Sequence, residues 1–272
     1  MRELERDLPP HTPPAPRDPP PSVGVVGDGR LGTVIARTLR DAGWAVDGPV
    51  GRGVVPRGDI LLLCVPDGEI STAAAVVAGA AARVGHTSGA TPLSALAPAA
   101  AAGAETFGLH PLQTVAWPDA RLEGAGCAIA GSSPGAARAA RELALALGMR
   151  PFLLADEDRA AYHAAASIAS NFVVTLESAA ERVAASAGLP PEQARGLLAP
   201  LVRGTVENWA ALEPERALTG PVARGDRTTV ALQRAAVAEA APELVPLWDV
   251  LVERTTALAG RGRAADPAAA TA

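Results

Sequence analysis

The stretch SVGVVGDGRLGTVIARTLRDAG, residues 22–43, decides the fold of the first half of this chain. It opens with a short run of valines that ends at Gly27, and apolar residues then recur at helical spacing as Leu31, Ile35 and Leu39. β-Branched runs favour strands, whereas an apolar period of three to four residues favours a helix with one buried face. The stretch therefore predicts a strand, a tight turn and a helix that ends at a glycine.

Three glycines in this turn follow the pattern Gly27-x-Gly29-x-x-Gly32. Between a strand and a helix, the first glycine permits the sharp turn, the second lets a pyrophosphate approach the backbone, and the third lets the helix pack closely on the strand. The free N–H groups at the helix start then hold the anion. The motif predicts a dinucleotide site made of Gly27, Asp28, Gly29, Arg30, Leu31 and Gly32, although a purely structural glycine turn is the alternative.

Strand and helix patterns go on alternating up to residue 155. Further strands are expected at 44–52, at 59–67, in the segment leading to residue 110, at 126–131 and at 149–154, with helices at 69–82 and from residue 133. Such alternation is typical of a parallel sheet with helices on both faces. We therefore expect an α/β fold whose N-terminal domain, residues 22–155, is a doubly wound parallel sheet.

Strand patterns vanish from residue 156 onward. One long helix is expected over 156–188, followed by helices at 191–211, 227–240 and 242–260. The sequence thus predicts an all-α C-terminal domain over residues 156–260. The proline-dense residues 1–21 and the tail 261–272 contain few large apolar side chains, so we expect both to be disordered.

The composition excludes several classes of function. A net charge of −5 with 49% hydrophobic residues describes a globular protein without electrostatic attraction to nucleic acid or to an anionic membrane. No apolar run reaches the roughly 18 residues of a membrane helix, and the N-terminus lacks the apolar core of a signal peptide, so a cytoplasmic location is expected. Cys64 and Cys127 lie in apolar runs and are expected to be reduced packing residues. No metal site is expected, and the chain contains no lysine that could act as an acid.

The end of the second expected strand bears on the choice of coenzyme. NAD enzymes place a carboxylate there for the ribose hydroxyls, whereas NADP enzymes need a cation for the 2′-phosphate. Asp47 lies inside the expected strand, and Arg52 stands at its end. This arrangement favours NADP(H) over NAD(H), with Arg52 contacting the phosphate, although an exposed arginine without a ligand is the alternative.

Three further segments end strands on the edge of the sheet where ligands collect, which is the edge formed by the carboxyl ends of the strands. They are CVPD (64–67), HTSGA (86–90) and LHPLQ (109–113), and they place four expected coenzyme contacts at Val65, Pro66, Ser88 and Gly89. His110 would lie at the nicotinamide end. Histidine titrates near working pH, so His110 is a candidate acid or substrate donor, although it could simply end a strand.

The segments LTGPVARGD (218–226), LHPLQT (109–114) and YHAAASIASN (162–171) resemble a family of Rossmann-like oxidoreductases whose C-terminal helical part is known as domain of unknown function 2520. More distantly, the layout is similar to that of ketopantoate reductases, pyrroline-carboxylate reductases and β-hydroxyacid dehydrogenases. The resemblance implies an N-terminal Rossmann domain and hydride exchange with a small carboxylate substrate held between the domains. It also implies a homodimer formed through the helices.

One departure from these relatives concerns the proton donor. Hydroxyacid dehydrogenases and ketopantoate reductases carry Lys-x-x-x-Asn on the first long helix after the nucleotide domain, and the corresponding residues here are Ser167 and Asn171. His163 stands one turn earlier, so on one continuous helix His163, Ser167 and Asn171 share a face. His163 or His110 could then supply the proton while Ser167 and Asn171 hold the carbonyl oxygen. The alternative is that these small polar residues only pack against a neighbouring helix.

The motif around Pro221 gives a candidate substrate clamp. Thr219 starts a helix entrance with unpaired N–H groups, and Arg224 with Asp226 offers a fork for a carboxylate and a partner that orients it, or else a capped turn tied by an internal ion pair. The whole sequence then suggests an NADP(H)-dependent oxidoreductase that reduces a ketopantoate-like 2-oxo acid. The alternatives are an NADP(H)-binding redox sensor without turnover and an oxidation like that of prephenate dehydrogenases, which share a G-x-His-Pro element.

Overall fold

A computed structural model describes residues 20–265 of the chain, with side chains up to residue 262. The chain divides into two compact units between Ile168 and Ala169. The predicted division at residue 155 precedes helix α5 (Arg159–Ala169), whereas the structural division falls at the end of this helix. Residues 1–19, most of the expected proline-rich tail, lie outside the described residues.

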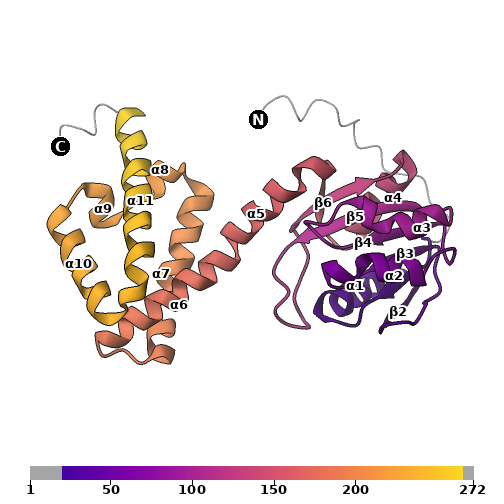
Figure 1. Cartoon of the computed structure of the whole chain (residues 1–272), viewed down its shortest axis with the longest axis horizontal. Helices are drawn as coiled ribbons and strands as arrows, with labels where there is room; N and C mark the ends of the chain where they lie inside the picture. Colours follow the sequence, from indigo (N-terminus) through magenta and orange to yellow (C-terminus); the bar gives the residue numbers. More distant parts are fainter. Residues whose placement is uncertain (1–19, 266–272) are drawn as a thin grey trace. The chain divides into compact units, whose positions relative to one another are not determined.

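The N-terminal unit is built on one seven-stranded sheet (Figure 1). Its strands are β1 (Val23–Val26), β2 (Val46–Val50), β3 (Ile60–Leu63), β4 (Arg83–His86), β5 (Glu105–Leu112), β6 (Gly126–Gly131) and β7 (Arg150–Leu153). They lie in the order β2-β1-β3-β4-β5-β6-β7. The expected α/β fold with a doubly wound sheet is confirmed.

One pair of strands departs from the prediction of a wholly parallel sheet. β5 and β6 are antiparallel, with Leu109 opposite Ile129, whereas every other neighbouring pair is parallel. Parallel neighbours need a crossover, usually a helix, but antiparallel neighbours do not. Residues 113–125 contain no helix, so the chain returns beside β5 in the opposite direction. The expectation of a fully parallel sheet is therefore wrong at this pair.

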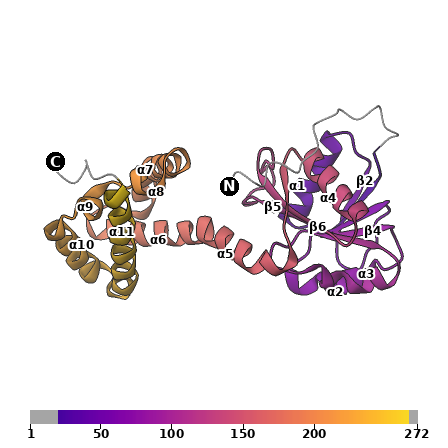
Figure 2. The ribbon, with the colours of Figure 1, turned by 90° about the horizontal axis from the view of Figure 1, so that it is seen from above.

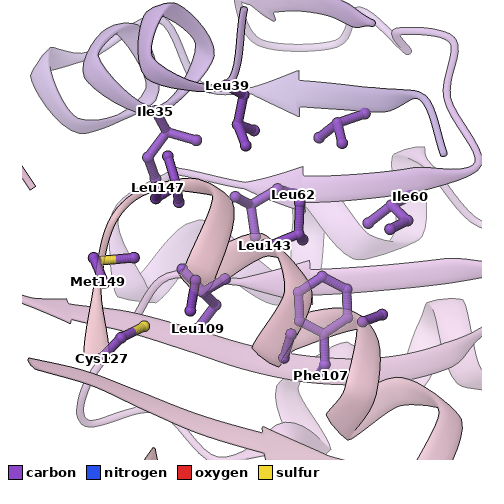
Figure 3. Close-up of a cluster of buried hydrophobic side chains, with 14 of the residues drawn as sticks. Ile35, Leu39, Ile60, Leu62, Phe107, Leu109, Cys127, Leu143, Leu147 and Met149 are labelled. Carbon is purple, nitrogen blue, oxygen red and sulfur yellow. The ribbon is translucent and has the colours of Figure 1, made fainter. Parts of the chain in front are cut away.

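Helices cover both faces of the sheet (Figure 2). α1 (Arg30–Asp41) and α4 (Pro134–Ala146) pack on one face, and α2 (Ile70–Val76) and α3 (Ala97–Ala101) pack on the other. β3 serves both cores, because Ile60 and Leu62 face α1 while Leu61 and Leu63 face α2. Figure 3 shows the larger core, in which Phe107 and Leu109 of β5 lie beside Leu143 of α4.

Short 3-10 segments connect these elements: η1 (Asp67–Glu69), η2 (Leu93–Leu96) and η3 (Asp156–Asp158). The helix expected over 69–82 is shorter than predicted and ends at Val76. Gly79, at φ +76°, lies in the left-handed region just beyond that end. Glycine adopts this conformation readily, and it is incompatible with a continuing helix.

The C-terminal unit is helical, as predicted (Figure 1). It comprises α6 (Asn171–Ser186), α7 (Pro191–Ala211), α8 (Pro214–Ala217), α9 (Gly220–Arg224), α10 (Arg227–Ala240), η4 (Pro242–Leu244) and α11 (Val245–Ala265). The bounds of α7 and α10 agree with the predicted ones. α11 contacts α8, α9 and α10. No described helix is both long and apolar enough to cross a bilayer.

Two helix predictions in this region need correction. The single helix expected over 156–188 is interrupted at Ser170, whose φ of −126° and ψ of −71° are not helical. Serine and asparagine side chains compete for backbone hydrogen bonds and so weaken a helix interior, and they stand together at this point. α11 continues through Ala265, so the tail expected to be disordered from residue 261 is helical at its start. Arg261 anchors this last turn through its Nε, which donates to Glu215 at 3.2 Å.

The C-terminal unit buries little apolar surface of its own. From Ala169 onward the buried apolar residues of the described chain are Ala194, Val237, Ala241 and Ala259. Large apolar side chains are instead exposed on several of its helices: Phe172, Val174, Leu197, Leu201, Val206, Trp209, Leu212, Leu232, Val250 and Leu251. The helices of this unit therefore carry more apolar surface than they cover.

Candidate active site

A cavity of about 290 Å³ opens at the carboxyl ends of β1 and β3. The chain leaves β1 for β2 on one side and then crosses to β3 on the other, so this crevice is the point where the strand order reverses. Open α/β sheets bind ligands at such a point. Six of the predicted coenzyme residues line the cavity: Gly27, Asp28, Gly29, Arg52, Val65 and Pro66.

Each glycine of the turn has its own steric reason. Gly27 lies at φ +104°, and a Cβ there would come within 2.2 Å of the Cys64 carbonyl oxygen. A Cβ on Gly32 would come within 1.9 Å of the Gly27 carbonyl oxygen, so α1 can pack on β1 only with glycine there. At Gly29 nothing lies within 4 Å of the Cβ position. The first and third glycines thus allow backbone contacts, and the second leaves open space beside the turn.

The start of α1 suits an anion. Gly29 caps the helix without a side-chain hydrogen bond, and the first turn carries no acidic residue. Backbone N–H groups at this end are left for a ligand, and the helix dipole favours negative charge there. Arg30 is exposed, whereas the Leu31 side chain packs against the core, so Leu31 could contribute only its backbone. Open space and unpaired donors together fit the diphosphate of a dinucleotide.

Arg52 lies at the rim of this cavity. Its side chain is 82% exposed and lies 3.2 Å from the Glu69 carboxylate, a pairing that solvent weakens. Asp47 of β2 accepts a hydrogen bond from the Arg57 backbone N–H at 2.7 Å, so its carboxylate is already engaged. At this end of β2 the cavity therefore presents a cation.

A polar cluster lies farther along the same edge of the sheet, where β5 meets α5. The Nδ1 atom of His110 lies 2.7 Å from the Tyr162 hydroxyl oxygen, and the two rings meet edge to face. The His163 ring centroid lies 5.8 Å from that of His110. The structure therefore brings together the two histidines that the sequence singled out, and it adds Tyr162, which the sequence analysis missed. Tyr162 is the single tyrosine of the chain and directly precedes His163, which was the available signal.

A buried arginine underlies this cluster. Arg159 is 3% exposed; its Nε donates to the Asp156 carboxylate at 2.6 Å and one terminal nitrogen donates to the Ser88 carbonyl oxygen at 3.3 Å. Asp156 also accepts from the Leu93 backbone N–H at 3.0 Å. A buried cation needs such partners, and here they tie the loop after β4 to the start of α5. The sequence analysis took these acidic residues only as a helix start and so missed Arg159.

The electrostatic environment keeps the cluster uncharged near neutral pH. Burial lowers the pKa of His110 to about 4, with smaller contributions from His163 and Arg159. Burial also raises the pKa of Tyr162 to about 12. His86 at the end of β4 is buried as well, and burial with the Arg159 charge lowers its pKa to about 4. Near pH 7, His110 is therefore a neutral imidazole and Tyr162 a protonated phenol.

Ser88 and Gly89, two predicted coenzyme contacts, are not among the residues that line the cavity. The Ser88 hydroxyl accepts from the Ala90 and Thr91 backbone N–H groups and closes a local turn. A Cβ on Gly89 would lie within 2.8 Å of the His110 ring. In the structure both residues support His110, since Ser88 shapes the turn and Gly89 leaves room for the imidazole.

The stripe expected from His163 to Asn171 is only partly formed. His163 and Ser167 lie one turn apart on α5, but the break at Ser170 separates them from Asn171, which begins α6. The prediction that all three share one continuous helix face is therefore wrong. Helical periodicity alone did not reveal this break.

The segment expected to clamp a substrate forms a capped turn. Thr219 caps α9, and Asp226 caps α10 by accepting from the Thr229 backbone N–H at 3.0 Å and from the Thr229 hydroxyl at 2.6 Å. Gly225 between the helices lies at φ +74°. Arg224 is exposed, and the ion pairs of the described residues include none between Arg224 and Asp226. The cap is the structural alternative foreseen for Asp226, whereas the expected ion pair is not formed.

Metal ions have no candidate site in the part of the chain that the structure describes, because no three His, Cys, Asp or Glu side chains there are grouped to hold one.

Residues 125–255 match a family described as "Domain of unknown function (DUF2520)". The chain carries a DUF2520 domain. The match begins just before β6, so the DUF2520 region includes the last two strands of the sheet as well as the helical unit. No curated protein sequence matches the chain significantly.

Solved structures with the same fold are oxidoreductases by description. A candidate NADP oxidoreductase from Bacteroides fragilis is 20% identical, with a TM-score of 0.73 over 87% of this chain and 98% of that one. A protein from Thermotoga maritima is 24% identical, with a TM-score of 0.70 over 89% and 99%. The pyrroline carboxylate reductase of Plasmodium falciparum, solved with NADP bound, is 12% identical, with a TM-score of 0.58 over 88% and 98%. The DUF2520 chain therefore has the Rossmann-like fold of NAD(P)-binding oxidoreductases.

The depressed histidine pKa values predict a loss of stability in mild acid. In the unfolded chain these imidazoles bind protons near pH 6.5, but in the folded chain only near pH 4. Between these values the unfolded state binds more protons, so the free energy of unfolding falls as the pH falls. Melting temperatures measured from pH 7 to pH 5 should decline, and the decline should be smaller in His110→Gln. An equal decline in that variant would contradict the assignment.

Proposed function

We propose that this protein is an NADP(H)-dependent oxidoreductase that transfers hydride to a small 2-oxo carboxylate. The observation that carries the proposal is the open space at Gly29, at the uncapped start of α1, beside a cavity at the switch point of the sheet. Few ligands other than a dinucleotide use such a site in this fold. The fold of the solved relatives supports the same coenzyme class.

The proposed coenzyme contacts follow from the cavity. Backbone N–H groups from Gly29 to Gly32 would hold the diphosphate, while Val65 and Pro66 would line the path along β3. Arg52 would pair with the 2′-phosphate of NADP(H), and its exposed pairing with Glu69 can be exchanged at little cost. The engaged carboxylate of Asp47 gives NAD(H) no matching acceptor there. These contacts support NADP(H) over NAD(H).

The chemistry proposed for the polar side chains completes this function. A bound dihydronicotinamide supplies the hydride. His110 and His163 lie together where a carbonyl oxygen could be polarised and protonated, and Ser167 and Asn171 are further candidates to hold that oxygen. Exposed Arg224, fixed by the Asp226 cap and the turn at Thr219, is proposed to pair with the substrate carboxylate. A ketopantoate-like acid would be the substrate.

Coenzyme binding can be tested by fluorescence titration with NADPH and NADH. Gly29→Asp introduces a side chain into open space at φ −68°, so the melting temperature should not change. Its carboxylate would repel the diphosphate and weaken NADPH binding on the order of 100-fold. Arg52→Gln should weaken NADPH binding about ten-fold and leave NADH binding unchanged, because only NADPH carries the 2′-phosphate. Arg141→Gln, an exposed change on α4, is the control. Undiminished NADPH binding in Gly29→Asp would refute the site.

Turnover can be tested by following NADPH oxidation with a panel of 2-oxo acids that includes ketopantoate. We expect steady oxidation, and His110→Ala should lower kcat on the order of 100-fold while NADPH affinity is retained, since the histidine would act on the substrate oxygen. Binding without turnover across the panel would favour a redox sensor. Reduction of NADP with a cyclohexadienyl substrate would favour the oxidation instead.

We also propose that the helical unit pairs with a second copy of itself. Three alanines and one valine are too little apolar core for this many helices, whereas Leu201 is 66% exposed and Trp209 is 60% exposed. A two-fold interface buries the same apolar face of both copies at once. One partner of identical sequence therefore provides the missing cover without requiring any other protein.

Light scattering after size exclusion tests the pairing. The full chain should elute with twice the mass of one chain, and Leu201→Glu should shift it toward a single chain, because a buried interface does not tolerate a charge. The matched control is Leu153→Glu, which changes an equally exposed leucine of the N-terminal unit. A monomeric wild-type chain would exclude the dimer.

A further inference from the structure

The Tyr162 hydroxyl has one hydrogen-bond partner among the described residues, and that partner is the Nδ1 atom of His110. A hydroxyl has a single proton to donate. If Nδ1 accepts this proton, both groups are satisfied. If Nδ1 carried its own proton and donated it, the Tyr162 proton would have no protein acceptor in a site where burial already raises the pKa of the phenol to about 12.

The opposite nitrogen of the His110 ring has no protein partner. No hydrogen bond to Nε2 is formed within the described residues, and Nε2 is not among the buried polar atoms that lack a partner. It is therefore accessible to a ligand. Gly89 adds to this accessibility, because a Cβ there would lie 2.9 Å from Nε2 and would displace the ring.

We propose that Tyr162 is a positioning residue that holds His110 in the tautomer protonated on Nε2, so that His110 meets the substrate oxygen as a neutral hydrogen-bond donor. This inference rests on the proposed function for its substrate, but not for the tautomer itself. The Nε2–H group polarises the carbonyl as hydride arrives. His110 keeps its proton, because giving it up would leave an imidazolate.

The same assignment separates the roles of the two histidines. Neutral His110 stabilises the developing oxyanion by a hydrogen bond. His163, whose ring centroid lies 5.8 Å away, is then the histidine that transfers a proton to the product oxygen and recovers one from solvent. Arg159 beneath the cluster also disfavours a second positive charge on His110, since its cation adds to the depression of the His110 pKa.

Nitrogen NMR of the full chain labelled with ¹⁵N-histidine tests the tautomer without coenzyme or substrate. The chain has four histidines, and His110→Gln identifies the signals of residue 110. At pH 7 we expect the shifts of a neutral ring protonated on Nε2. In Tyr162→Phe the Nδ1 and Nε2 shifts should move toward each other, as in a mixture of tautomers. The control is Phe152→Leu, which removes a ring contact to Tyr162 but no hydrogen bond, and it should keep the wild-type pattern.

Two results would overturn the proposal: a wild-type His110 protonated on Nδ1, or an unchanged pattern in Tyr162→Phe. The first needs only the wild-type protein, so it decides even if the variant folds poorly. Where 2-oxo acid reduction is observed, Tyr162→Phe should lower kcat about five- to ten-fold with little change in KM, the size of one neutral hydrogen bond. An absence of turnover would reject the proposed function and leave the NMR result to decide the tautomer.

Discussion

The contact on which the N-terminal unit depends is the approach of the α1 backbone to the β1 turn. Gly32 lies so close to the Gly27 carbonyl that no side chain fits, and Gly27 is equally close to the Cys64 carbonyl. Two backbone crossings without Cβ atoms therefore bring the start of α1 directly over the ends of β1 and β3. The unpaired N–H groups of that helix start then lie beside a cavity, where they can meet an anion. Any bulkier residue at Gly27 or Gly32 would push helix and strand apart and remove the cavity's floor.

The second constraint is the burial of charge and polarity where β5 meets α5. Arg159 is almost fully buried, and its cation is compensated by the Asp156 carboxylate and the Ser88 carbonyl oxygen. Buried charges of this kind contribute little net stability, because desolvation offsets the attraction. Their effect is to fix the loop after β4 and the start of α5 and to keep the nearby imidazoles neutral. The same burial that depresses the His110 pKa also makes its hydrogen bond to Tyr162 strong and directional.

The two units satisfy their apolar surface in different ways. In the N-terminal unit every strand of the sheet centre is covered by helices on both faces, so its core is complete (Figure 3). In the helical unit small side chains fill the interior and large ones point outward. Alanine-rich helices approach each other closely but bury little area, which leaves Leu197, Leu201 and Trp209 without cover in a single chain.

The sequence by itself determined the elements whose signals are local. The valine run and the glycines predicted β1, the turn and α1; the apolar run 60–63 predicted a strand buried on both faces; and apolar periodicity bounded α7 and α10. Most of the lining of the cavity followed as well, because strand ends and glycine spacing are properties of short segments. Only the tertiary structure decided that β6 runs antiparallel to β5, that the helix breaks at Ser170, and that Tyr162 meets His110 across 52 residues of sequence. Such pairings depend on which surfaces are buried together, and no periodicity within a segment carries that information.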